Sequence, residues 1–137
     1  MRPRTSSRLA EKLVIDASAM VDYLVDSPLA AQVAERIADS EILVPAHFGA
    51  QVLSALGRLH RGGELSEADV KARVALTARA PFHRHLLAPL LEGAWARHDN
   101  VRLADALYIE LANQVDATII TTDSGMAAAA GNAEHIE

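Results

Sequence analysis

Two short apolar runs in this chain each end at an aspartate, and this pattern constrains the fold more than any other. Residues 13–15 (Leu-Val-Ile) lead into Asp16, and residues 118–122 (Thr-Ile-Ile-Thr-Thr) lead into Asp123. Short β-branched runs are typical of buried strands, and the residues after each aspartate are typical of helix starts. In an open parallel sheet, sites form outside the carboxyl ends of the strands. We therefore expect both aspartates at one crevice, where burying two like charges is costly unless a cation lies between them.

The composition narrows the class of protein. The chain has 137 residues, which suits one domain, and it has no cysteine, which excludes disulfides, thiolate metal sites and cysteine nucleophiles. The net charge of −5 argues against a general nucleic-acid coat, but an acidic metal site would carry much of that charge in a nuclease. No run approaches the roughly 18 apolar residues of a membrane span, and no secretory apolar region follows the basic N-terminus. A cytoplasmic location without membrane contact is expected.

Alternating strand and helix patterns predict an α/β fold, with helices on both faces of a central, mostly parallel sheet of about four or five strands. Residues 1–11 are expected to form a flexible tail and residues 12–137 a single domain. The expected strands are 12–15, 42–44, 83–87, 118–122 and an edge strand at the end of the chain. The expected helices are 18–25, 28–40, 45–62, 66–79, 89–97, 102–115 and 124–130.

A third aspartate interrupts an otherwise apolar segment. Asp105 lies near the start of the predicted helix 102–115, with Leu103, Leu107 and Leu111 around it. An acid in the first helical turn can simply cap the helix or stabilise its dipole. Because an unpaired aspartate among apolar residues is expensive, a functional role is the alternative interpretation. Glu110 lies on a different face of the same helix and is expected to be solvated.

Three motifs, taken in order, resemble the PIN-domain nucleases. They are Val-Ile-Asp-Ala-Ser at residues 14–18, Ala-Asp-Ala-Leu-Tyr-Ile-Glu-Leu-Ala at residues 104–112, and Ile-Ile-Thr-Thr-Asp at residues 119–123. Each motif alone is weak, but the ordered set with these gaps is specific and covers about residues 12–136. The length of the chain and the helix between Pro45 and Gly63 resemble the toxins of VapBC toxin–antitoxin pairs. The resemblance implies a three-layer α/β/α PIN fold and a ribonuclease that depends on Mg²⁺ or Mn²⁺.

The resemblance also assigns the site residue by residue. PIN domains place four acids around one or two metal ions, and Asp16, Asp105 and Asp123 match three of these metal ligands. Ser18 and Thr121 match hydroxyl positions that support the site. Cleavage by metal-activated water is expected to leave a 5′-phosphate and a 3′-hydroxyl.

The remaining acid is where this chain departs from the family pattern. A glutamate is usual six positions after the proline that precedes the helix, and Gln51 stands there, six positions after Pro45. An amide oxygen is neutral and the amide NH₂ cannot ligate, whereas Mg²⁺ prefers hard oxygen ligands. We expect weaker metal binding and impaired catalysis, and a second ion should suffer most. A degenerate nuclease, a one-ion enzyme and a deliberately neutralised acid remain open explanations.

The expected partners follow from the resemblance and from the predicted helix at residues 45–62. Arg58 follows Gln51 by seven residues on the same helical face, and with Arg61 it is a candidate contact for RNA phosphates. The resemblance implies a cognate antitoxin, and a homodimer or a hetero-oligomer with that antitoxin is expected.

Two other functions fit parts of the sequence. A PIN fold with a weak or inactive site would act mainly by binding antitoxin or RNA, and Gln51 favours it. A phosphoacceptor receiver domain also gathers aspartates at strand ends. It would need an aspartate after a middle strand and a lysine after a late strand, but residues 42–50 contain no aspartate and no lysine follows Lys71.

Overall fold

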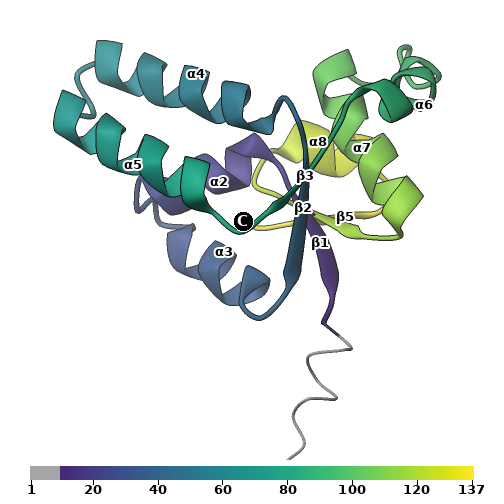
Figure 1. The fold of residues 1–137 in the computed structure, drawn as a ribbon, viewed down its shortest axis with the longest axis horizontal. Coiled ribbons are helices and arrows are strands. Elements are labelled where there is room, and N and C mark those ends of the chain that lie inside the picture. The colour runs from purple at the N-terminus through teal and green to yellow at the C-terminus, as the bar shows by residue number, and fades with distance from the viewer. Residues whose placement is uncertain (1–9) are drawn as a thin grey trace, which may run out of the picture.

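The computed structural model describes residues 10–137. This part of the chain folds around one five-stranded sheet (Figure 1). The strand order is β3-β2-β1-β4-β5, and every pairing is parallel. The strands are β1 (Lys12–Ile15), β2 (Glu41–Pro45), β3 (His83–His85), β4 (Thr118–Thr121) and β5 (Ala133–His135). The predicted α/β class with a mostly parallel sheet is confirmed. Most of the predicted tail lies outside the described residues.

Helices cover both faces of the sheet, as a three-layer α/β/α fold requires. In Figure 1, α2, α3, α4 and α5 lie on one side of the strands, and α6 and α7 lie on the other. The helices are α2 (Ala17–Leu24), α3 (Ala30–Ile37), α4 (Phe48–Arg61), α5 (Glu67–Arg79), the 3₁₀ turn η1 (Ala88–Leu90), α6 (Leu91–Trp95), α7 (Leu103–Val115) and α8 (Ser124–Ala129). None of the helices between residues 10 and 137 has the length and apolarity needed to cross a bilayer.

The central strands β1 and β4 explain why the chain has two apolar runs. Both strands are covered by helices on two faces, and such strands are apolar throughout rather than alternating. Their residues Leu13, Val14, Ile15, Ile119 and Ile120 are all fully buried. Ile15 pairs with Ile120 in the parallel register, so the next residues on each strand, positions 16 and 121, also lie side by side. The sheet itself therefore brings together the two strand ends that carry the polar residues.

The predicted boundaries are wrong at two prolines and within one helix. Pro45 does not open a helix but ends β2, and α4 begins at Phe48 after a turn. Similarly, Pro28 lies in a turn, and α3 begins at Ala30. The single helix expected over 89–97 is instead η1 followed by the five-residue α6. Proline fixes φ but does not by itself select a helix, so turns at these positions satisfy it equally well.

Candidate metal centre

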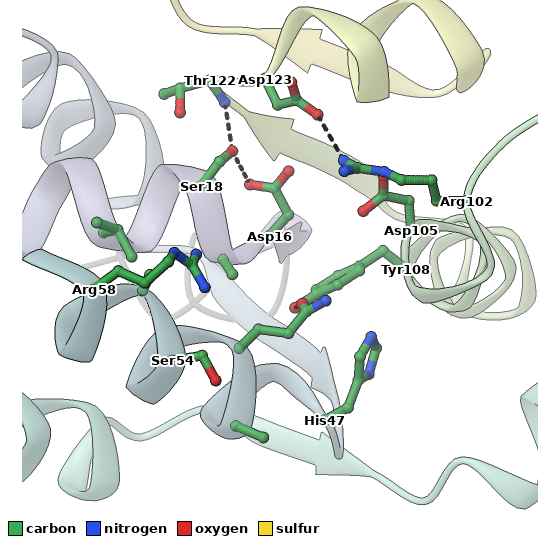
Figure 2. Close-up of a pocket in the computed structure, with 15 residues that line it drawn as sticks. Asp16, Ser18, His47, Ser54, Arg58, Arg102, Asp105, Tyr108, Thr122 and Asp123 are labelled. Carbon is green, nitrogen blue, oxygen red and sulfur yellow. Dashed lines mark hydrogen bonds and ion pairs between the residues drawn. The ribbon is translucent and has the colours of Figure 1, made fainter.

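A cavity of about 670 Å³ opens beyond the carboxyl ends of β1 and β4. Three elements surround it: the strand ends with the starts of α2 and α8, one face of α4, and the first turns of α7 (Figure 2). Its polar lining consists of Asp16, Ser18, His47, Gln51, Ser54, Arg58, Arg102, Asp105, Tyr108, Thr122 and Asp123. Segments more than a hundred residues apart in sequence therefore contribute to one pocket.

Asp16 is held rigidly at the base of this cavity. It is the N-cap of α2, and its Oδ1 accepts hydrogen bonds from the backbone N–H of Ala19 at 3.0 Å and from the hydroxyl of Ser18 at 2.7 Å. Its Oδ2 accepts a hydrogen bond from the hydroxyl of Thr121 at 2.5 Å. A carboxylate oxygen accepts about two hydrogen bonds, so Oδ2 retains a lone pair for a further partner. Asp16 thus caps the helix and still has a carboxylate oxygen available as a metal ligand.

The two hydroxyl residues join the ends of the strands. Ser18 Oγ lies 3.3 Å from Thr121 Oγ1 and accepts the backbone N–H of Thr122 at 3.2 Å, a contact drawn in Figure 2. Thr121 Oγ1 accepts the backbone N–H of Asp123 at 3.0 Å. These bonds fix the position of Asp16 relative to the residues that follow β4, which is the geometry that a supporting role would require.

Asp123 and Asp105 enter the cavity from two different helix starts. Asp123 is the N-cap of α8 and accepts the backbone N–H groups of Gly125 at 3.4 Å and Met126 at 3.2 Å. Asp105 lies in the first turn of α7, where its Oδ2 accepts N–H groups from Arg102 at 3.0 and 3.2 Å. Asp123 therefore caps a helix and also lines the pocket, whereas Asp105 lies in a first helical turn and lines the pocket without capping the helix.

Gln51 faces the same cavity from α4, and its amide is held by Tyr108. The phenol of Tyr108 donates a hydrogen bond to Oε1 of Gln51 at 2.7 Å. Burial and the nearby aspartates raise the pKa of Tyr108 well above its usual range, so this phenol remains a donor. The position that carries an acid in the family pattern is therefore part of the pocket, but its oxygen already accepts one hydrogen bond.

His47 is a site residue that the sequence did not reveal. Its Nε2 lies 2.9 Å from the backbone oxygen of Ala104, which ties the start of α4 to the start of α7. Its ring packs against Tyr108 at 5.0 Å between centroids, and its buried Nδ1 has no partner among the described residues. Burial lowers the pKa of His47, so the neutral ring is favoured. Its spacing of four residues before Gln51 was the available signal, because it places both side chains on one helical face.

The two candidate RNA-binding arginines have different positions. Arg58 lines the cavity from α4, with Ser54 and Gln51 on the same face, whereas Arg61 does not line it. Arg102 contributes a second cationic side chain to the lining, which the sequence interpretation had missed. Glu110 is a further correction: its side chain is 12% exposed and pairs with Arg97 at 2.5 Å, so it is not solvated.

The family model of the PIN domain matches residues 13–132. The chain belongs to the PIN-domain family. Ribonuclease VapC3 of Mycobacterium tuberculosis is 48% identical to this PIN domain over 120 residues, which cover 87% of this chain and 88% of VapC3. Ribonuclease VapC1 of the same species is 33% identical over 123 residues, covering 88% of this chain and 92% of VapC1. The predicted membership of the VapC-type group is confirmed.

Solved structures share the fold of this PIN domain. PAE2754 from Pyrobaculum aerophilum superposes with a TM-score of 0.67 at 19% identity and covers 93% of this chain and 84% of its own. A toxin-antitoxin complex from Klebsiella pneumoniae contains a chain that superposes with a TM-score of 0.64 at 15% identity, covering 91% and 98%. At these identities the likeness concerns the fold alone, and it confirms the PIN-like architecture.

The donor set of this PIN domain fits a hard divalent cation. Within residues 10–137, no three histidine, cysteine, aspartate or glutamate side chains are already close enough to enclose a metal ion. Nevertheless, three carboxylates line one cavity, and the Arg102 guanidinium contacts two of them, Asp105 at 3.0 Å and Asp123 at 3.7 Å. The positively charged guanidinium of Arg102 therefore already lies between these two acids. Mg²⁺ and Mn²⁺ favour carboxylate oxygens, so the chemistry of the lining suits them once the side chains close around the ion.

Burial of Asp16 gives the metal-free protein a specific pH dependence. Burial raises the pKa of Asp16 above its ordinary value of 3.8, although the hydrogen bonds from Thr121, Ala19 and Ser18 oppose this shift. A carboxyl group with a raised pKa binds its proton more tightly in the folded chain than in the unfolded chain. The ionised group therefore reduces the free energy of unfolding as the pH rises from the unfolded pKa through the folded pKa, and the penalty persists above it.

We expect Asp16→Asn to stabilise the metal-free chain at neutral pH. Asparagine also caps helices well and carries no charge, so the variant avoids the cost of ionisation in the folded state. Urea unfolding in EDTA, from pH 4 to pH 7.5, should show the parent losing stability relative to the variant as the pH rises. Asp39→Asn, at an exposed position, should track the parent. If the free energy of unfolding of the parent instead rose relative to that of Asp16→Asn with increasing pH, the inferred pKa shift would be contradicted.

Proposed function

We propose that this chain is a metal-dependent endoribonuclease toxin of a type II toxin–antitoxin pair, with activity reduced by Gln51. The observation that carries the proposal is the convergence of Asp16, Asp105 and Asp123 on one cavity from three separate segments of the fold. The kinship with VapC3 and VapC1, both named as ribonucleases, supports RNA as the substrate. In this proposal the three aspartates hold Mg²⁺ or Mn²⁺.

Each residue of the cavity has a distinct task in the proposed reaction. When bound, the ion supplies Lewis-acid activation of the scissile phosphate and of the attacking water. Asp16, fixed by Ser18 and Thr121, provides a preoriented oxygen donor, and such preorganisation by surrounding hydrogen bonds is what makes metal sites effective. Asp123 is oriented by the backbone N–H groups at the start of α8. Gln51 contributes a neutral oxygen where a charged one is usual, which leaves the ion less tightly held.

The basic residues of the cavity suit the RNA backbone. Arg58 lines the pocket from α4 and is exposed, so its guanidinium is available to a phosphate without the cost of breaking a buried contact. Arg61 lies outside the lining and would reach only RNA that extends beyond the pocket. The net charge of −5 means that RNA must be attracted locally, by these arginines and by the bound cation, rather than by the whole surface.

A partner is part of the proposal. The toxin-antitoxin complex from Klebsiella pneumoniae has a chain of the same fold, which supports a cognate antitoxin as partner. Large apolar side chains exposed on several helices, including Leu53, Leu76, Leu91 and Trp95, provide surface for an antitoxin or for a second copy in a homodimer. A cytoplasmic location agrees with an RNA target.

The test is cleavage of a structured RNA by the purified chain in Mn²⁺, in Mg²⁺ and in EDTA, with the ends of the products identified. We expect slow cleavage that requires the metal and leaves a 5′-phosphate and a 3′-hydroxyl. Products with a 2′,3′-cyclic phosphate would contradict the proposal, because they arise from attack by the ribose hydroxyl rather than by water. Cleavage that persists in EDTA would contradict it as well.

A second candidate function is binding without efficient turnover. Two features favour it. Gln51 is neutral and its oxygen already accepts a hydrogen bond from Tyr108, and Arg102 occupies two of the aspartates that a metal ion would need. In that case the chain would bind RNA or antitoxin with an affinity that does not respond to Mn²⁺, and no cleavage would be detected even at high protein concentration.

A further inference from the structure

Arg102 places a positive charge inside the acidic pocket. Its Nη2 lies 3.0 Å from Oδ2 of Asp105 and 3.7 Å from Oδ2 of Asp123, and its Nε donates to the same oxygen of Asp105 at 3.2 Å. Figure 2 shows the guanidinium reaching between the two carboxylates. One side chain therefore contacts two of the three acids that the proposed function assigns to the metal.

The contact follows from local sequence and from the topology of the sheet. Arg102 is the N-cap residue of α7 and Asp105 is the third residue of the same helix, so the pair forms within a single turn. Asp123 comes from the end of β4 and meets the same guanidinium from the opposite side. Two carboxylates brought close together repel each other, and a guanidinium between them offsets that repulsion.

The contact is weak enough to be exchanged. The Arg102 side chain is 79% exposed, and ion pairs with such exposed arginines contribute little because water and salt screen them. A divalent ion carries twice the charge and binds carboxylate oxygens directly. The ion can therefore replace the guanidinium, but only after both oxygens have been released.

We propose that Arg102 is a resident counter-cation that competes with the divalent ion for Asp105 and Asp123. The inference rests on the proposed function, since it assumes that these aspartates bind metal. Arg102 holds the two carboxylates together in the metal-free chain and raises the ion concentration at which the site fills. The chain thus carries a built-in threshold for metal loading, separate from the effect of Gln51.

Calorimetric titration of Mn²⁺ into the parent chain and into Arg102→Gln tests this inference. We expect the variant to bind Mn²⁺ about three- to tenfold more tightly, the change that corresponds to one or two lost exposed ion pairs. Thermal melts in EDTA verify that both proteins are folded, as expected for a substitution at an exposed side chain. A parent that binds no Mn²⁺ beside a variant that does would also support the inference.

Arg58→Gln is the matched control, because it removes the same charge from the same cavity lining without removing an ion pair to Asp105 or Asp123. An equal increase in Mn²⁺ affinity in both variants would indicate a general electrostatic effect of the lost charge. It would overturn the proposal that Arg102 competes with the ion. Weaker binding by Arg102→Gln, or no binding by either protein, would overturn it too. RNA cleavage on the same samples tests the proposed function separately. Tighter Mn²⁺ binding by Arg102→Gln without any cleavage would contradict the proposed nuclease activity but would still support competition between Arg102 and the ion.

Discussion

Replacing Asp105 by asparagine is expected to reduce RNA cleavage about 100-fold or more and to weaken Mn²⁺ binding by at least tenfold. Even residues that only support metal ligands lower metal affinity or activity about 10- to 100-fold when they are removed, and a direct ligand should have a larger effect. Asparagine keeps the shape of the side chain and its place in the first turn of α7, so the fold should persist. What it removes is one of the three formal charges available to the ion. Initial rates of cleavage and calorimetric titration on the same samples measure both effects.

The control for Asp105 is Asp116→Asn. Asp116 is exposed and ends α7 in a left-handed conformation with φ of 57°, which asparagine tolerates well. This variant should cleave RNA at the parent rate. If Asp105→Asn retained full metal-dependent cleavage, Asp105 would be only a helix-dipole residue and the three-acid site would be wrong.

Gln51→Glu is expected to have the opposite effect, with Mn²⁺ bound about 10- to 100-fold more tightly and RNA cleaved correspondingly faster. The substitution adds a fourth negative charge to the lining at nearly constant volume. The phenol of Tyr108 can donate to the new carboxylate as it now donates to the amide oxygen. In EDTA the variant should be less stable than the parent, because the added charge repels the other acids until an ion is present.

Gln32→Glu provides the matched control for this gain, since it makes the same chemical change on α3, outside the cavity lining. It should leave both metal affinity and cleavage unchanged. Combining Gln51→Glu with Asp105→Asn should abolish most of the gain, because residues that act on one ion are not additive. Unchanged affinity and unchanged cleavage in Gln51→Glu would mean that position 51 is not part of the metal site.

The central strands and their terminal aspartates could be predicted because local and long-range constraints agree there. A strand buried on both faces must be apolar, and it ends where the first charged residue appears, so Asp16 and Asp123 are marked by the runs before them. Parallel register then brings the two ends together without any further information. Gln51 was placed only through the family pattern, since nothing in the local sequence directs that side chain into the cavity.

Other features depend on contacts between segments that no local pattern encodes. Glu110 has the sequence environment of a solvated helix residue, yet α6 packs on α7, and Arg97, just beyond the end of α6, pairs with Glu110. Similarly, the Arg102 contact with Asp123 exists only because the start of α7 lies beside the end of β4. Pro45 and Pro28 were assigned to helix starts because proline is compatible with that position, but it is equally compatible with a strand end or a turn.

The most direct test of the metal centre is a crystal of Gln51→Glu soaked in Mn²⁺, with anomalous scattering used to locate the ion. The proposal predicts a peak in the cavity at about 2.1 Å, the distance of small divalent cations from their oxygen ligands, from carboxylate oxygens of Asp16, Asp105 and Asp123. It also predicts that Arg102 no longer contacts Asp105 and Asp123. A peak elsewhere, or an empty cavity at saturating Mn²⁺, would contradict the three-aspartate site.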